Sequence, residues 1–194
     1  MNDQASRIRF AVYTTVFGVL WGLAEMFLGT WLKALNMPLK GAVMAAIGAV
    51  LLSAGRVYVP RRWSTLSTGL VAAALKMVSF SAFKLGPVSG IMIEALVMEA
   101  VFSVFGNGSA AVFWATLLAC FEGVPHFFVS NWLIYGGGIF GAYIDAAARI
   151  QKMLGFSGDM WLKVVAVWAG AHLLIGALAG AGAAAVAGRI RREA

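Results

Sequence analysis

The sequence has 194 residues, of which 61% are hydrophobic and only 12% are charged, and its mean hydropathy is +0.86. Soluble globular domains carry about 25% charged residues. The composition therefore excludes an ordinary soluble domain and predicts a single all-α integral membrane domain over residues 1–194, with the lipid bilayer as its surroundings.

The net charge of +7 would favour nucleic acid as a partner in a soluble protein. Here the basic residues lie mostly between apolar segments, where they are typical of membrane orientation, so we expect no nucleic-acid partner. The single cysteine, Cys120, excludes an internal disulfide and any multi-cysteine metal site.

Apolar segments separated by short polar, Gly-rich or Pro-containing segments predict a bundle of six membrane-spanning helices. In chain order these helices cover residues 9–31, 41–58, 64–84, 87–105, 109–135 and 161–188. The segment 136–160 is too charged to span a bilayer. Its apolar residues recur at helical spacing opposite Asp145, Arg149 and Lys152, which predicts a short interfacial helix before the last span.

The basic residues outside the apolar segments predict the orientation. If the N-terminus is cytoplasmic, eight arginines lie inside: Arg7, Arg9, Arg56, Arg61, Arg62, Arg189, Arg191 and Arg192. Six basic residues then lie outside: Lys33, Lys40, Lys84, Arg149, Lys152 and Lys163. This excess predicts an N-in, C-in, multi-pass protein of the cell (plasma or inner) membrane.

Ionisable residues within the predicted spans are the strongest indication of function. A charge in hydrocarbon costs at least about 2.5–3.5 kcal/mol, so such residues usually face a cavity or a partner. Counted from the helix ends at about 1.5 Å per residue, the polar set gathers in the outer half of the bilayer, together with tryptophans. We therefore predict an outward-facing substrate pocket formed by Trp21, Glu25, Glu94, Glu122, His126, Asn131, Trp132, Tyr135 and His172. For His172, a hydrogen-bonded core histidine is an equal alternative.

Glu122 and His126 are at positions i and i+4 and therefore share one helix face. Pro125, which lies between them, cannot donate to the carbonyl of Phe121 and leaves that oxygen free to bind a ligand. These features are typical of a helix that lines a pocket. The alternative is a kinked helix in which Glu122 pairs with a neighbouring helix.

Lys76 lies in the third predicted span, which a tight turn joins to the fourth. At its depth the lysine can reach Glu94 or Glu99. We interpret Lys76 and Glu99 as a structural buried ion pair.

Several motifs are absent from the sequence. It contains no G-x-x-x-x-G-K-[ST] phosphate loop, no H-E-x-x-H and no G-x-S-x-G. The chain is therefore not a P-loop ATPase by itself, and neither a zinc peptidase nor a serine hydrolase is indicated. We expect no metal and no cofactor.

Small residues recur along one side of the first predicted helix, at Ala11, Thr15, Gly18 and Gly22. Such a face allows another helix to approach closely. That helix belongs either to the same chain or to a partner subunit.

With six helices, a cytoplasmic N-terminus, a Pro/Gly loop after the first helix and a polar pocket toward the outside, the chain resembles the substrate-binding S components of energy-coupling-factor (ECF) vitamin transporters. In that family a small-x-x-x-small face on the first helix docks onto a transmembrane coupling subunit, which implies docking through Ala11, Thr15, Gly18 and Gly22. The family's loop between the first two helices covers the bound vitamin. Here that loop is residues 33–41, which implies a lid containing Asn36, Pro38 and Lys40. The sequence begins Met-Asn-Asp, unlike the Met-His of the family's cobalt and nickel members.

The resemblance implies a binding subunit without chemistry of its own, while two separate cytoplasmic ATPases hydrolyse ATP. Excess carboxylate near tryptophan suits a small, nitrogen-rich, cationic ligand, for which a thiamine-like compound is the best match. Two alternatives stay open. One is an intramembrane enzyme that uses Glu122 and His126 as an acid/base pair. The other is a structural membrane protein whose polar groups hold its helices together.

Overall fold

The computed structural model describes residues 3–35, 37, 39–79, 85–155 and 159–193. Within these residues the chain forms seven α-helices and no strand. The helices are α1 (Asp3–Ala34), α2 (Lys40–Tyr58), α3 (Ser64–Val78), α4 (Leu85–Phe105), α5 (Ser109–Tyr135), α6 (Gly138–Leu154) and α7 (Met160–Glu193). Five of them, α1, α2, α4, α5 and α7, are long and apolar enough to cross a membrane. The predicted all-helical architecture is therefore confirmed.

The third helix is shorter than the predicted range of 64–84. It ends at Val78, and the N–H of Ser79 donates to the carbonyl of Lys76 at 3.1 Å, which closes the last turn and ends the helix. The 15 residues of α3 rise about 22 Å, less than the roughly 30 Å of hydrocarbon in a bilayer. The predicted continuous span over 64–84 is therefore wrong, and residues 80–84 lie outside the described part of the chain.

Two helices extend beyond their predicted ends. The first was expected over 9–31, but α1 begins at Asp3, where the carboxylate pairs with Arg7 at 2.9 Å one turn later. The last helix, expected over 161–188, continues to Glu193. Hydropathy marks only the apolar part of a helix, whereas backbone hydrogen bonding continues through polar residues that are good helix formers.

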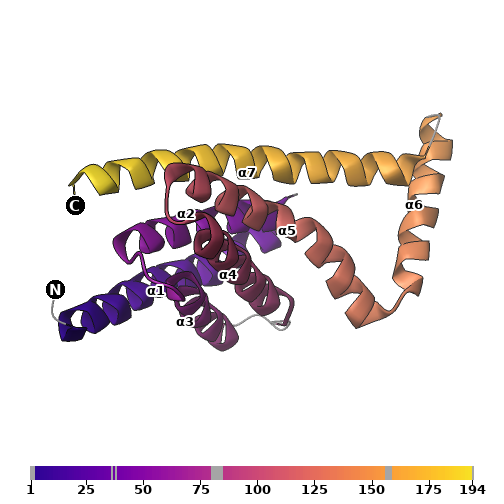
Figure 1. The fold of residues 1–194 in the computed structure, drawn as a ribbon. Helices are drawn as coiled ribbons and strands as arrows, with labels where there is room; N and C mark the ends of the chain where they lie inside the picture. The colour runs from indigo at the N-terminus through magenta and orange to yellow at the C-terminus, as the bar shows by residue number, and fades with distance from the viewer. Residues whose placement is uncertain (1–2, 36, 38, 80–84, 156–158, 194) are drawn as a thin grey trace.

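Both termini lie at one end of the bundle, and α6 lies at the opposite end, where it joins α5 to α7 (Figure 1). The most extensive packing is between α5 and α7 and between α1 and α3. The segment predicted as a surface helix does form a helix, α6, in which only Ala147 is buried.

Two glycines of α1 form the contact with α3. A Cβ added to Gly18 would lie 2.6 Å from the Cβ of Val71, and one added to Gly22 would lie 2.8 Å from the side chain of Leu75. These glycines are buried inside the chain, so the prediction that they form part of a docking face is wrong. Small residues at this spacing permit close approach but do not specify which helix approaches. Ala11 and Thr15 are exposed.

A buried ion pair lies near the terminal end of the bundle. Arg56 and Glu99 are each 4% exposed, and Nη1 of Arg56 lies 3.1 Å from Oε1 of Glu99. Glu99 also accepts hydrogen bonds from the backbone N–H groups of Trp63 at 2.8 Å and Thr65 at 3.1 Å. Nε of Arg56 donates to Oδ1 of Asn107 at 2.7 Å. This network fixes the α2–α3 and α4–α5 connections to each other.

The predicted pair of Lys76 with Glu99 is therefore wrong. Glu99 pairs with Arg56, and Lys76 pairs with Glu25 of α1 at 3.2 Å. The physical reason is lateral packing. The close contact of α1 with α3 brings Glu25 beside Lys76, and sequence depth alone does not reveal which helix lies next to which.

Candidate ligand-binding cavity

A cavity of about 930 Å³ opens in the bundle, and all seven helices contribute to its wall. Its lining comes from the C-terminal parts of α1, α3 and α5 and from the N-terminal parts of α2, α4 and α7. Because successive helices run up and down the bundle, these parts meet at the end away from both termini (Figure 1). The polar residues predicted to share one depth therefore gather at one end.

The first charged group of the cavity is the pair of Glu25 and Lys76. The ammonium lies 3.2 Å from Oε2 of Glu25 and also donates to the backbone carbonyl of Glu25 at 2.6 Å. Both side chains are largely buried. A Cβ added to Gly29 would lie 3.3 Å from Oε2, so the carboxylate closely approaches the backbone of α1. This pair is neutral as a unit.

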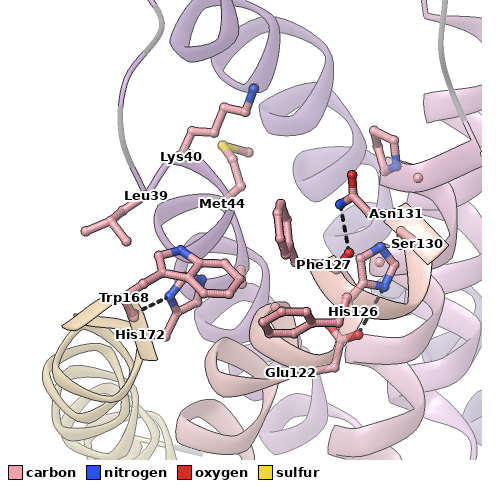
Figure 2. A pocket seen from close by; sticks show the side chains of 18 of the residues that line it. Leu39, Lys40, Met44, Glu122, His126, Phe127, Ser130, Asn131, Trp168 and His172 are labelled. Atoms are coloured by element: carbon pink, nitrogen blue, oxygen red, sulfur yellow. Dashed lines mark hydrogen bonds and ion pairs between the residues drawn. The ribbon is translucent and has the colours of Figure 1, made fainter. Parts of the chain in front are cut away.

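The second group is the pair of Glu122 and His126, in which Nδ1 of the imidazole lies 3.2 Å from Oε1 (Figure 2). The two residues share a helix face, as their spacing indicates. Helix α5 continues through Pro125, which is exposed and does not line the cavity. Phe121 does not line it either, so the expectation that its carbonyl serves the pocket is wrong.

Glu94 is the third carboxylate of the cavity, and it lies close enough to Glu25 and Glu122 to be repelled by each of them. Among the described residues, it makes no hydrogen bond and no ion pair. Glu94 is partly buried, and a carboxylate that is partly withdrawn from water without a partner is unfavourable. Glu94 is therefore the cavity carboxylate that a hydrogen-bond donor or a cation on a ligand would stabilise most.

His172 contributes to the wall from α7. Its Nδ1 lies 2.9 Å from the carbonyl oxygen of Trp168 (Figure 2). A carbonyl oxygen only accepts, so Nδ1 is the donor of this hydrogen bond and Nε2 is the ring nitrogen left for other contacts. That nitrogen would lie 3.2 Å from a Cβ added to Gly123. His172 is thus both a hydrogen-bonded core histidine and a residue of the cavity wall, so the two readings of the sequence are compatible.

Aromatic side chains of α5, α6 and α7 complete the wall. The hydroxyl of Tyr143 donates to Oδ1 of Asn131 at 3.2 Å, and its ring stacks on Trp161 with centroids 5.9 Å apart. Phe127 packs edge-on against Trp168 at 5.1 Å. Sequence reasoning placed none of these four aromatic residues in the pocket. Tyr143 was missed because α6 was assigned entirely to the membrane surface, and the other three lie on the apolar helices α5 and α7, whose inward side hydropathy does not reveal. The position of Tyr143, on the apolar side of α6, was the available signal.

Most of the predicted pocket residues lie on the cavity: Glu25, Glu94, Glu122, His126, Asn131, Tyr135 and His172. Trp21 does not, because it is fully buried against Gly48 of α2, and Trp132 does not, because it is 56% exposed on the outside of α5. Both predictions are wrong for the same reason: a uniformly apolar helix does not reveal which side faces inward. Lys40 lines the cavity, whereas Asn36 and Pro38 lie outside the described residues.

Comparisons with protein-family models, curated proteins and solved structures return no match for this chain. Within the described residues, no group of three or more His, Cys, Asp or Glu side chains is arranged to hold a metal ion. The functional conclusion therefore depends on the chemistry of the cavity itself.

Proposed function

We propose that the chain is the membrane-embedded substrate-capture subunit of an ECF-type importer and that it holds a small organic cation in the cavity. The observation that carries this proposal is the position of Glu94, a partly buried and unpaired carboxylate that shares a mostly apolar cavity wall with Glu25 and Glu122. A cationic ligand would supply the missing partner. A nitrogen-rich compound of the thiamine type fits best.

The rest of the cavity supports this assignment. Its volume of about 930 Å³ lies within the usual range for small-molecule sites. Trp161, Trp168 and Phe127 offer aromatic faces, which attract organic cations with about 0.5–2 kcal/mol each. The Glu25–Lys76 and Glu122–His126 pairs add donors and acceptors that orient a ring carrying several nitrogens.

In this proposal the chain crosses the cell membrane six times, with both termini in the cytoplasm and the cavity facing outward. Helix α6 lies along the outer membrane surface in this arrangement. The supporting observations are the two termini at one end of the bundle, the cavity at the other and the arginines concentrated at the terminal end.

Cysteine accessibility tests this orientation. In a Cys120→Ala background, a cysteine at Lys40 is expected to react with an impermeant thiol reagent applied outside intact cells, because it lies at the cavity end. Cysteines at Gly108 and Arg192 are expected to resist it until the membrane is permeabilised. External labelling of Gly108 and Arg192 with protection of Lys40 would reverse the topology.

The partners in this proposal are a transmembrane coupling subunit and two cytoplasmic ATPases, since the sequence carries no phosphate loop of its own. Ala11 and Thr15 remain candidates for the docking face because they are exposed on α1. Gly18 and Gly22 are no longer candidates, because α3 covers them.

Substituting Glu94 with Gln tests the proposed function. The change preserves side-chain size and removes the charge, so binding of thiamine to the purified chain is expected to weaken by about 1.5–3 kcal/mol, or roughly 10- to 150-fold. Isothermal titration calorimetry measures this difference. The matched control is Glu193→Gln at the exposed end of α7, which should bind as the wild type does. Equal affinity in both variants, with normal melting temperatures, would show that Glu94 does not serve the ligand.

An intramembrane enzyme is the second candidate, and the 3.2 Å contact between Glu122 and His126 favours it. A carboxylate and an imidazole in this arrangement can transfer a proton within a bound molecule. To separate the two functions, the bound compound is recovered after the calorimetry and identified by mass spectrometry. An unchanged compound supports capture, whereas a converted compound that requires His126 supports catalysis.

A further inference from the structure

The charged residues of the cavity are ordered along its depth. The pairs of Glu25 with Lys76 and of Glu122 with His126 occupy the inner part, together with the unpaired Glu94. Two further lysines, Lys33 and Lys40, also line the cavity, and both are exposed. The inner part thus carries an uncompensated negative group, and the part nearer the solvent carries two positive groups.

The separation between these regions follows from the geometry of α1. Lys33 lies eight residues beyond Glu25 on the same helix, a rise of about 12 Å toward the outer end. Lys40 is the first residue of α2, which begins at that end. Among the described residues neither lysine has an ion pair or a hydrogen-bonding acceptor for its ammonium group. The mouth of the cavity therefore presents two cations that no described acidic group neutralises.

The beginning of α2 adds to this positive potential. Its first turn contains no acidic residue, and the capping position, Leu39, makes no side-chain hydrogen bond to the helix. The N–H groups at a helix N-terminus carry partial positive charge and favour an anion when no side chain satisfies them. Leu39, Lys40 and Gly41 all line the cavity, so this potential acts at its mouth.

We propose that the ligand is a zwitterion, an organic cation that also carries a phosphate group. The cationic part lies beside Glu94, and the phosphate meets Lys33 and Lys40 at the mouth. This inference rests on the proposed function and narrows its substrate class, because Lys33 and Lys40 offer an anionic group at the mouth a second point of contact.

Two matched pairs of compounds test the inference: thiamine with thiamine monophosphate, and pyridoxamine with pyridoxamine 5′-phosphate. Binding to the purified full-length chain is measured by isothermal titration calorimetry. At least one phosphorylated compound is expected to bind about 10- to 100-fold more tightly than its parent, the effect of one or two charge-assisted hydrogen bonds. In the Lys33→Ala/Lys40→Ala double variant that advantage should be lost, whereas the affinity of the parent compound should stay within about threefold.

Lys152→Ala is the matched control, since Lys152 is an exposed lysine of α6 that does not line this cavity. It should retain the preference for phosphate. Parent compounds that bind as tightly as their phosphates would overturn the zwitterion inference and leave the proposed function intact. Failure of all four compounds to bind would contradict both. A phosphatidylethanolamine molecule found at the lysines by native mass spectrometry would support the zwitterion and contradict import of a soluble compound.

Discussion

Glu99→Gln is expected to lower the free energy of unfolding by about 3–5 kcal/mol, because it leaves the guanidinium of Arg56 buried without a counter-charge. The carboxylate is 4% exposed, pairs with Arg56 at 3.1 Å and accepts the N–H groups of Trp63 and Thr65 at the start of α3. A single substitution therefore disturbs both an ion pair and a helix terminus. Thermal or SDS-induced unfolding of the purified protein in detergent measures the change.

Asp3→Asn is the matched control for this experiment. It also removes one carboxylate from an ion pair, but the side chains of Asp3 and Arg7 are 72% and 73% exposed. Exposed pairs contribute about 0–1 kcal/mol, so this variant should unfold almost as the wild type does. If both variants lowered the free energy of unfolding by the same small amount, the Arg56–Glu99 network would not hold the α2–α3 and α4–α5 connections together.

Gly18→Ala is expected to destabilise the chain by about 1–3 kcal/mol through overpacking. The added Cβ would lie 2.6 Å from the Cβ of Val71 and 2.7 Å from the backbone oxygen of Thr68. Because a backbone oxygen cannot rotate away, α1 and α3 would have to separate. The unfolding of the isolated chain reports this effect directly.

Gly182→Ala on α7 is the control for this substitution, because a Cβ added to Gly182 would have no neighbouring atom within 4 Å. Alanine is preferred to glycine in a helix interior, so this variant should be as stable as the wild type or up to about 1 kcal/mol more stable. If Gly18→Ala instead left the isolated chain fully stable but prevented assembly with partner subunits, the glycine face would be a docking surface after all.

The sequence predicts both ends of α5 correctly. Helix α5 covers 109–135 as predicted, with Gly108 before it and Gly136, at φ 74°, after it. It fails at α3, where no glycine or proline marks the end at Val78 and the apolar segment continues. Hydropathy alone does not mark where a helix ends within an apolar segment.

The depth of the polar residues was also predictable, because each helical residue adds a fixed rise along the axis. Their lateral positions were not. Trp21 and Glu25 were assigned to one pocket, yet the indole packs into the core against Gly48 while the carboxylate reaches the cavity. Similarly, Lys76 has the right depth for several acidic partners, and only the contact of α1 with α3 selects Glu25.

Native mass spectrometry of the purified full-length chain, with identification of any bound small molecule, tests the central claim most directly. The account predicts one organic cation bound to each wild-type chain, with its occupancy strongly reduced in Glu94→Gln and retained in Glu193→Gln. The opposite result would be a wild-type chain that binds only uncharged or purely anionic molecules, or a cation whose occupancy is the same in all three proteins. Either outcome would contradict a cavity built to hold a cation at Glu94.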